Sequence, residues 1–170
     1  GELYKAQNNY RASVVLRPLQ PSAWFRLGTI SMQLKDFDNA LVAFTEVVQQ
    51  HPEESEAWAN VAAVHMHNKK PAEAYPALVE SLKQNRNNWR VWVSKLHTCL
   101  DLEKYDEAIQ ACSMILDFKK KKAGSADKDV AEMQIEPKCV RAIVGGTLDR
   151  YNAARTTANG EDAASSQGEL

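Results

Sequence analysis

The stretch "SAWFRLGTI" at residues 22–30 is followed 34 residues later by "EAWANVAAV" at 56–64, and after the same interval by "RVWVSKLHT" at 90–98. The tryptophans of the three stretches are Trp24, Trp58 and Trp92. In the first two stretches an apolar residue follows three positions after the tryptophan and a small residue four positions after it. This pattern predicts a helix that recurs with a fixed period.

Other columns of residues share the 34-residue interval, so the tryptophans are not an isolated coincidence. The columns are Ala40, Ala74 and Ala108; Phe44, Leu78 and Cys112; and Val47, Ser81 and Ile115. Over residues 3–118 the chain resembles the tetratricopeptide repeat (TPR) family, whose unit is a helical hairpin of about 34 residues. The resemblance implies an all-α fold, a right-handed solenoid of about three full hairpins plus flanking helices.

Periodicity and capping residues predict six helices in these repeats, and a seventh before them. The repeat helices are expected over 22–34, 37–50, 55–68, 71–84, 89–102 and 105–118, with N-caps at Ser22, Asp36 and Ser55. Pro71 suits a first helical turn, whereas Pro76 should kink its helix or delay its start.

The domain organisation follows from the same frame. Residues 1–20 are expected to hold the second helix of a truncated repeat over 2–17, because Ala6, Tyr10 and Pro18 continue the repeat columns. Repeats then occupy 21–54, 55–88 and 89–118, and 119–150 is expected to hold a loop and capping helices. Residues 151–170 are small and polar and are expected to be disordered. We expect the chain to be a piece of a longer protein.

Within residues 119–150, the lysine-rich "KKKKAGSADKD" breaks the period and is expected to be a solvated loop. The apolar residues from Val130 to Leu148 predict another helix, packed as the first helix of a displaced fourth unit. Pro137 should bend or divide that helix.

The third repeat departs from the pattern at two positions. Lys95 stands where the first two units have Leu27 and Val61, and Leu96 stands in the small-residue phase. Either the helix is rotated, or Lys95 lays its stem along the surface and keeps its ammonium in water.

Composition excludes several classes of protein. The chain has 21 basic and 22 acidic residues and a formal net charge of -1, which gives no basic face for nucleic acid or an anionic membrane. Three cysteines argue against a disulfide framework and for reduced thiols. We therefore expect a cytoplasmic protein, or one that is nuclear as well.

No residue pattern points to catalysis, a metal or a cofactor. His65 and His67 are two apart on a helix and point in different directions, so they do not share a metal easily. His65 and Cys99 share one phase and are expected to be packing positions. Cys112 stands at a core position, and no glycine-rich phosphate loop is present. We expect neither an enzyme nor a cofactor.

The expected function is to bind a peptide or a partner helix along the concave face, which the first helix of each unit lines. By helical phase the partner-binding residues are Phe25, Thr29, Met32, Asn60, Ala63, His67, Arg90, Ser94 and His97. A co-chaperone that grips the acidic C-terminal tail of a heat-shock chaperone is one alternative. Of the clamp positions of such domains, however, only Asn60 and Arg90 match in kind, and Phe25 and Thr29 carry no cation. Self-association through exposed repeat ends is the second alternative.

A closer resemblance rests on the string "LKDFDNALVAFTEVVQQHPEESEAWANVAAVH" at 34–65, "NNWRVW" at 87–92 and "VRAIVGG" at 140–146. These segments are similar to the C-terminal half of the family of tetratricopeptide repeat protein twenty-seven. The resemblance implies a non-catalytic adaptor that takes part in assembling larger complexes alongside co-chaperones, with a link to cell-wall maintenance in fungi. It supplies no ligand-binding residues.

Overall fold

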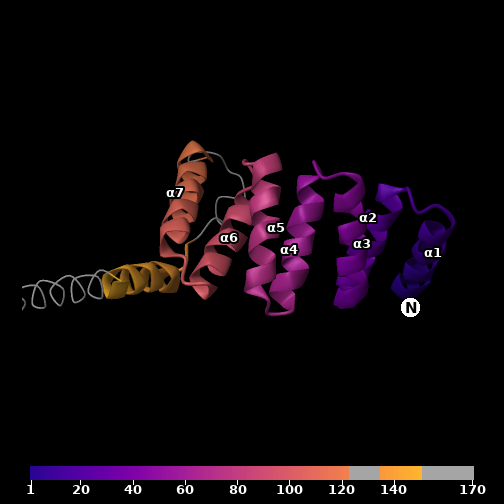
Figure 1. Ribbon diagram of the computed structural model, residues 1–170, viewed down its shortest axis with the longest axis horizontal. Coiled ribbons are helices and arrows are strands. Elements are labelled where there is room, and N and C mark those ends of the chain that lie inside the picture. The colour runs from indigo at the N-terminus through magenta and orange to yellow at the C-terminus, as the bar shows by residue number, and fades with distance from the viewer. Residues whose placement is uncertain (123–134, 151–170) are drawn as a thin grey trace, which may run out of the picture.

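The computed structural model describes residues 1–122 and 135–150, and all regular structure in these two ranges is helical. The helices are α1 Glu2–Leu16, α2 Pro21–Gln33, α3 Phe37–Gln50, α4 Ser55–His67, α5 Pro71–Gln84, α6 Trp89–Asp101 and α7 Tyr105–Lys122. A further helix spans residues 137–150. Figure 1 shows α1 to α7 side by side in one row, and the main contacts join helices that are neighbours in the chain.

The all-α hairpin solenoid is thus confirmed, and five of the six predicted repeat helices agree with the structure to within one residue. In the described parts of the chain, no helix combines the length and the apolar character needed to cross a membrane.

The three repeated tryptophans occupy equivalent surroundings. The indole Nε1 of Trp24, Trp58 and Trp92 donates to the backbone carbonyl six residues earlier, over 2.7, 2.8 and 2.9 Å respectively. Each indole therefore joins the first helix of its unit to the linker before it. This shared hydrogen bond explains why tryptophan recurs at this position.

The turn inside each hairpin is also repeated. Lys35, Lys69 and Glu103 have φ values of 58°, 57° and 56°, in the left-handed region that non-glycine residues rarely adopt. In each turn the next amide donates to the carbonyl five residues before it, over 2.8 to 2.9 Å. This bond closes the C-terminus of the first helix in a Schellman-type motif. No glycine marks these turns, so the sequence analysis placed them between the helices but did not predict their left-handed residues.

Inside each hairpin, the two helices meet at a pair of residues whose sizes compensate. A Cβ placed on Gly28 would lie 2.8 Å from Cε1 and Cζ of Phe44, so only glycine fits beneath this ring. By the 34-residue period, the pairs in the three units are Gly28 with Phe44, Ala62 with Leu78, and Leu96 with Cys112. In the third unit, the larger Leu96 of the first helix is thus matched by the smaller Cys112 of the second helix.

Two of the predicted helix caps are wrong. α2 begins at Pro21, so Ser22 lies within its first turn. Ser55 is the first residue of α4, and its hydroxyl donates 3.0 Å to the carbonyl of Ser81 in α5. The hydroxyl of Ser81 returns a 2.9 Å bond to the carbonyl of Ser55, so this serine joins the two helices of its hairpin. The cap at Asp36 is confirmed by a bond from the amide of Asn39.

The structure shows where the prolines lie in the helices. α5 begins at Pro71, as predicted, so Pro76 does not delay its start. Near the helix start its missing N–H removes a single intrahelical bond. Pro137 is the first residue of the helix over 137–150, a position that proline favours, and the part of the predicted helix before residue 135 lies outside the described residues.

The predicted loop from residue 119 is wrong at its beginning, since α7 continues to Lys122. Lysine is a good helix former and its charge suits a helix C-terminus. The rest of that loop and the predicted disordered tail at 151–170 lie outside the described residues, as do Val130 and Met133.

Lys95 is buried, so its stem does not lie along an exposed surface, which was one of the two alternatives for this position. Its side chain is 8% exposed, and Nζ lies 5.3 Å from the ring centre of Trp92 and 6.0 Å from that of Tyr75. Cation–π contacts therefore replace part of the lost hydration.

One column of polar contacts joins successive units. Nε2 of Gln7 donates to Oγ of Ser31 at 3.1 Å and to Oδ2 of Asp36 at 2.8 Å. Sixty-eight residues later, the hydroxyl of Tyr75 donates to Glu107. Burial, and then this bond, raise the pKa of Tyr75. A second helix thus reaches the next unit in both cases, at the helix cap Asp36 in one and at the first turn of α7 in the other.

In the middle unit of this column the polar partner is missing. The residue equivalent to Gln7 and Tyr75 is Leu41, which cannot hydrogen-bond. The residue equivalent to Ser31 is His65, whose Nδ1 is buried without a hydrogen-bond partner among the described residues. Burial accordingly lowers the pKa of His65.

Candidate binding groove

Two hollows lie between neighbouring first helices of the solenoid. The first hollow, of about 490 Å³, lies between α2 and α4 and is lined by Pro21, Ser22, Phe25, Arg26, Val47, His51, Glu54 and Glu56. The second hollow, of about 580 Å³, lies between α4 and α6 and is lined by Glu54, Ser55, Glu56, Ala59, Asn60, Ala63, Leu78, Asn85, Asn88, Arg90, Val91 and Ser94. The two hollows share Glu54 and Glu56, so they adjoin one another.

The hollows are the same site in two successive repeats. Adding 34 to Phe25, Arg26 and His51 gives Ala59, Asn60 and Asn85, which line the second hollow. The backbone frame is thus constant while the side chains change. The first hollow carries the aromatic ring of Phe25 and charged side chains of both signs, and the second carries small side chains and three asparagine amides.

Five of the nine predicted partner-binding residues line the hollows. They are Phe25 in the first hollow and Asn60, Ala63, Arg90 and Ser94 in the second. Phe25 also packs edge-on against Phe44, with ring centres 5.6 Å apart. Their role in binding stays a prediction.

The structure places the other four elsewhere. The hydroxyl of Thr29 donates back to the carbonyl of Phe25 at 2.9 Å, and Met32 packs against the core. His67 stacks on Phe37, with ring centres 5.0 Å apart and an interplanar angle of 13°. These side chains are engaged within the solenoid itself.

His97, the last of the four, faces the helix over 137–150. Its Nδ1 lies 4.0 Å from Sγ of Cys139, which is 1% exposed. The chain's own C-terminal helix therefore covers the third unit at this point.

Carboxylates and cations alternate along the groove. Arg26 lies on one side of Glu54 and Glu56, and Arg90 on the other, with its guanidinium 4.8 Å from the ring centre of Trp89. In the described part of the chain, neither glutamate forms an ion pair. The two carboxylates beside Asn60 and Arg90 would repel an acidic tail, which adds to the case against a two-carboxylate clamp.

The cysteines are not arranged for nucleophilic chemistry. Burial, and then the nearby carboxylate of Glu107, raise the pKa of Cys99 to about 11, so its thiol is protonated at neutral pH. Burial also raises the pKa of Cys112 and of Cys139. Among the described residues, no group of three or more His, Cys, Asp or Glu side chains is placed to hold a metal ion.

The sequence analysis missed several groove residues, including Glu54, Glu56, His51 and Asn85. It placed the groove along the middle of the first helices, whereas the hollows lie near their N-terminal ends and include the preceding linkers. A signal was present for His51 and Asn85, which are 34 residues apart.

Comparison with solved structures shows what these hairpins are. A double mutant of MamA superposes with a TM-score of 0.68 at 14% sequence identity, covering 75% of this chain and 70% of that one. YrrB, titled as a TPR protein with an unusual peptide-binding site, superposes with a TM-score of 0.61 at 15% identity, covering 92% and 84%. The chain folds as a TPR solenoid.

Family models and other structures agree with this fold. A tetratricopeptide repeat model matches residues 1–46, and the model of the anaphase-promoting complex, cyclosome, subunit 3 matches residues 33–114. The TPR2B domain of yeast Sti1, in a structure titled as its complex with pHsp70, superposes with the solenoid at a TM-score of 0.56 and 17% identity, covering 76% of this chain and 97% of that one.

Curated relatives of the TPR solenoid are much longer proteins. The TPR repeat-containing protein C19B12.01 of Schizosaccharomyces pombe is 31% identical over 85% of this chain, and trd-1 of Caenorhabditis elegans is 28% identical over 97%. Essential for maintenance of the cell wall protein 1 of Saccharomyces cerevisiae is 27% identical over 77%. The chain spans only 16 to 20% of the length of these relatives.

Proposed function

We propose that this solenoid is a non-catalytic scaffold that binds a peptide or a partner helix along the two adjoining hollows. The observation that carries the proposal is their repetition: one hollow recurs in successive units, and the two meet at Glu54 and Glu56. A ligand can therefore contact both without a gap. YrrB, which shares the fold, is titled for a peptide-binding site, and this supports the proposal.

The chemistry of the second hollow suits a polypeptide backbone. Asn60, Asn85 and Asn88 line it, and each amide can both donate and accept a hydrogen bond. The small apolar side chains of Ala59 and Ala63 leave room for a ligand side chain between the helices. These groups recognise peptide units without the paired cations that an acidic tail requires.

We further propose that the segment acts as an adaptor within a longer protein of the tetratricopeptide repeat protein twenty-seven family, and that this protein is cytoplasmic, or nuclear as well. The name of the yeast relative connects that protein with the cell wall. Assembly of larger complexes alongside co-chaperones is the role proposed for the longer protein.

Blocking the second hollow tests the groove proposal. Peptides that bind the wild-type chain are first selected from a random library. Their affinity for the wild-type chain and for each variant is then measured by fluorescence anisotropy. Ala63→Trp fills the hollow and should weaken binding at least tenfold, whereas Val42→Trp, at an exposed position on α3, should not. Circular dichroism verifies that both variants are folded. Equal affinity of the two variants would overturn the proposal.

A second titration addresses the co-chaperone alternative. An acidic C-terminal chaperone peptide is titrated calorimetrically into the chain, and no binding is expected at micromolar concentration. Micromolar binding that Arg90→Ala abolishes would replace the groove proposal with a chaperone-tail receptor.

A further inference from the structure

The junction of the two hollows carries two carboxylates that the repeat fold does not require. Glu54 is the N-cap residue of α4, and its side chain caps no backbone amide. Glu56 lies in the first turn of the same helix. α2 and α6 have no acidic residue in the first turn, and their equivalent positions are held by Gln20 and Ser22 in α2 and by Asn88 and Arg90 in α6. The same helix start thus forms with neutral or basic residues, so the two carboxylates belong to the surface chemistry of this one site.

The charge of these carboxylates is not neutralised by the cation beside them. Glu54 and Glu56 are exposed and line both hollows. Arg26 lines the first hollow with them, yet within residues 1–122 and 135–150 no ion pair joins it to either glutamate. His51 lines the same hollow, and its Nδ1 lies 2.9 Å from Oε1 of Glu53, which lines neither hollow. A cation on a ligand in the groove would therefore meet a complementary charge at the junction.

The first hollow also offers an apolar wall beside the carboxylates. Pro21, Phe25 and Val47 line it together with Glu54 and Glu56. Lysine and arginine have an apolar stem and a charged tip, so their stems can lie along apolar groups while the tip meets a carboxylate. Arginine suits this combination better, because its planar guanidinium can stack on an aromatic ring and can bind a carboxylate through two parallel hydrogen bonds.

We infer that the groove selects a peptide with a basic residue, arginine in preference to lysine, whose charged tip binds between Glu54 and Glu56. This preference rests on peptide binding by the groove, as proposed above, and adds the charge of the ligand to it. The stem of the basic residue lies along Phe25 in the first hollow, and the peptide backbone continues along the asparagines of the second hollow. The same two carboxylates repel an acidic residue at this point, so they also select against acidic peptides.

The test uses the peptides selected on the wild-type chain, each made a second time with citrulline in place of every arginine. Citrulline keeps the shape of arginine and removes its charge. Affinities are measured by fluorescence anisotropy for the wild-type chain and for the double variant Glu54→Gln, Glu56→Gln. The matched control is the double variant Glu2→Gln, Glu73→Gln, because these exposed glutamates lie in the first turns of α1 and α5 and line neither hollow. Circular dichroism verifies that both double variants are folded.

The selected peptides should be enriched in arginine and lysine and depleted of acidic residues relative to the library. Replacing arginine by citrulline should weaken binding to the wild-type chain and to the control roughly fivefold, as expected for two exposed ion pairs. The Glu54→Gln, Glu56→Gln variant should bind the arginine peptide as weakly as the wild-type chain binds the citrulline peptide. It should show no further loss with citrulline, because the carboxylates that recognise the charge are absent.

Peptides that Ala63→Trp weakens but that carry no excess of basic residues would overturn the inference and leave the groove proposal standing. So would a citrulline effect that persists in the Glu54→Gln, Glu56→Gln variant, or an equal loss in the control. Failure to select any peptide would overturn the groove proposal and this inference together. The chain alone is also examined by sedimentation velocity at high concentration. A dimer that the Glu54→Gln, Glu56→Gln variant abolishes would make a second copy the occupant and would overturn the inference.

Discussion

The compensating pair beneath Phe44 allows a quantitative test of how the hairpins pack. In Gly28→Ala the new Cβ would lie 2.8 Å from two ring atoms of Phe44, which is 1% exposed and has little room to move. Overpacking of a core costs about 1–3 kcal/mol. Replacing a helical glycine by alanine returns about 1 kcal/mol. The single variant should therefore lose about 1 kcal/mol of unfolding free energy.

The second hairpin has Ala62 and Leu78 at the same two positions, so it indicates which second substitution should restore the stability lost in Gly28→Ala. Phe44→Leu alone leaves a cavity over Gly28 and should cost roughly 2 kcal/mol. In the double variant the alanine methyl enters that space, so the total loss should be about 1 kcal/mol in place of the sum of about 3. The coupling free energy is then about 2 kcal/mol.

Urea unfolding followed by circular dichroism measures all four members of this double-mutant cycle. Mutations at independent sites add to within about 0.5 kcal/mol. If the losses of the two single variants add to within that margin, the sizes of the residues at positions 28 and 44 are not coupled, and the explanation of this pair is refuted.

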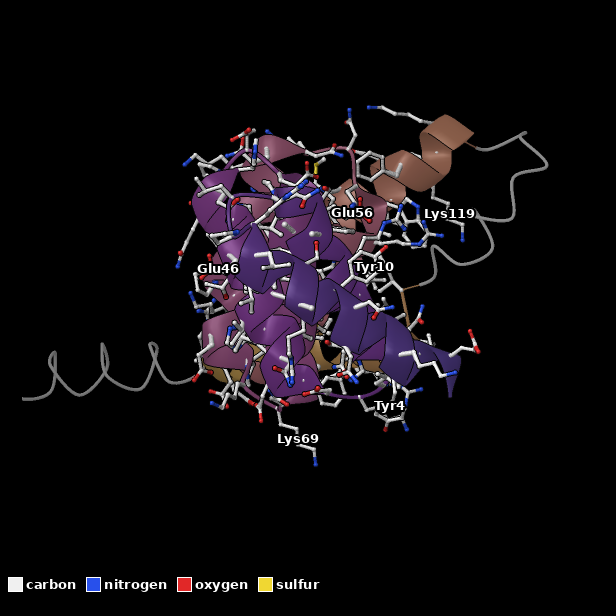
Figure 2. All side chains as sticks on the ribbon, turned by 90° about the vertical axis from the view of Figure 1, so that its right-hand side faces the viewer. Tyr4, Tyr10, Glu46, Glu56, Lys69 and Lys119 are labelled. Atoms are coloured by element: carbon white, nitrogen blue, oxygen red, sulfur yellow. The ribbon has the colours of Figure 1, made fainter. Side chains whose placement is uncertain are left out.

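Three further predictions concern other features of the solenoid. Tyr75→Phe removes the hydrogen bond to Glu107 and should lower the unfolding free energy by about 1 kcal/mol in urea titration; an unchanged midpoint would contradict a role for this bond between units. Lys69 has a φ of 57° and projects from the edge of the molecule (Figure 2), so Lys69→Gly should raise the unfolding free energy by about 0.5–1 kcal/mol, measured by thermal melting. Burial lowers the pKa of His65 in the folded state, so the unfolded chain binds the proton more readily and stability should fall as pH drops below about 6.5, with no effect above it. His65→Gln should remove this dependence between pH 7.5 and 5.5, and His51→Gln, at an exposed position, should keep it.

The helices could be predicted because their signals are local and repeated. Trp24 and its two equivalents fix the period, and Asp36 caps α3 as its residue type suggests. The caps at Ser22 and Ser55 were mispredicted because another constraint acts at each position. Pro21 takes the first helical position of α2, and Ser55 bonds across to α5 instead of to its own helix.

The groove was predictable only in part, because helical phase does not show which side chains are engaged elsewhere. Asn60 and Ser94 follow the phase and line the second hollow. His67 does not, because Phe37 of the neighbouring helix stacks on it. His97 does not either, because Cys139 approaches from a segment that breaks the period. Both exclusions depend on tertiary contacts that no single helix encodes.

The left-handed residues of the turns were missed for a physical reason as well. A left-handed residue in a helix-terminating turn is most often glycine, and here two lysines and a glutamate take that conformation. The bond from the following amide to the carbonyl five residues earlier offsets their steric cost. Only the 34-residue spacing of Lys35, Lys69 and Glu103 would have revealed them.

Because the main contacts among α1 to α7 join each helix to its neighbours in the chain, the shape of each hairpin depends mainly on the adjacent units. Stability in such an array is close to a sum of unit and nearest-neighbour terms. Gene duplication or deletion of one whole unit would therefore lengthen or shorten the binding surface and leave the remaining hollows intact. Evolution can then change the length of the binding surface through the number of units, and its selectivity through point substitutions within each hollow.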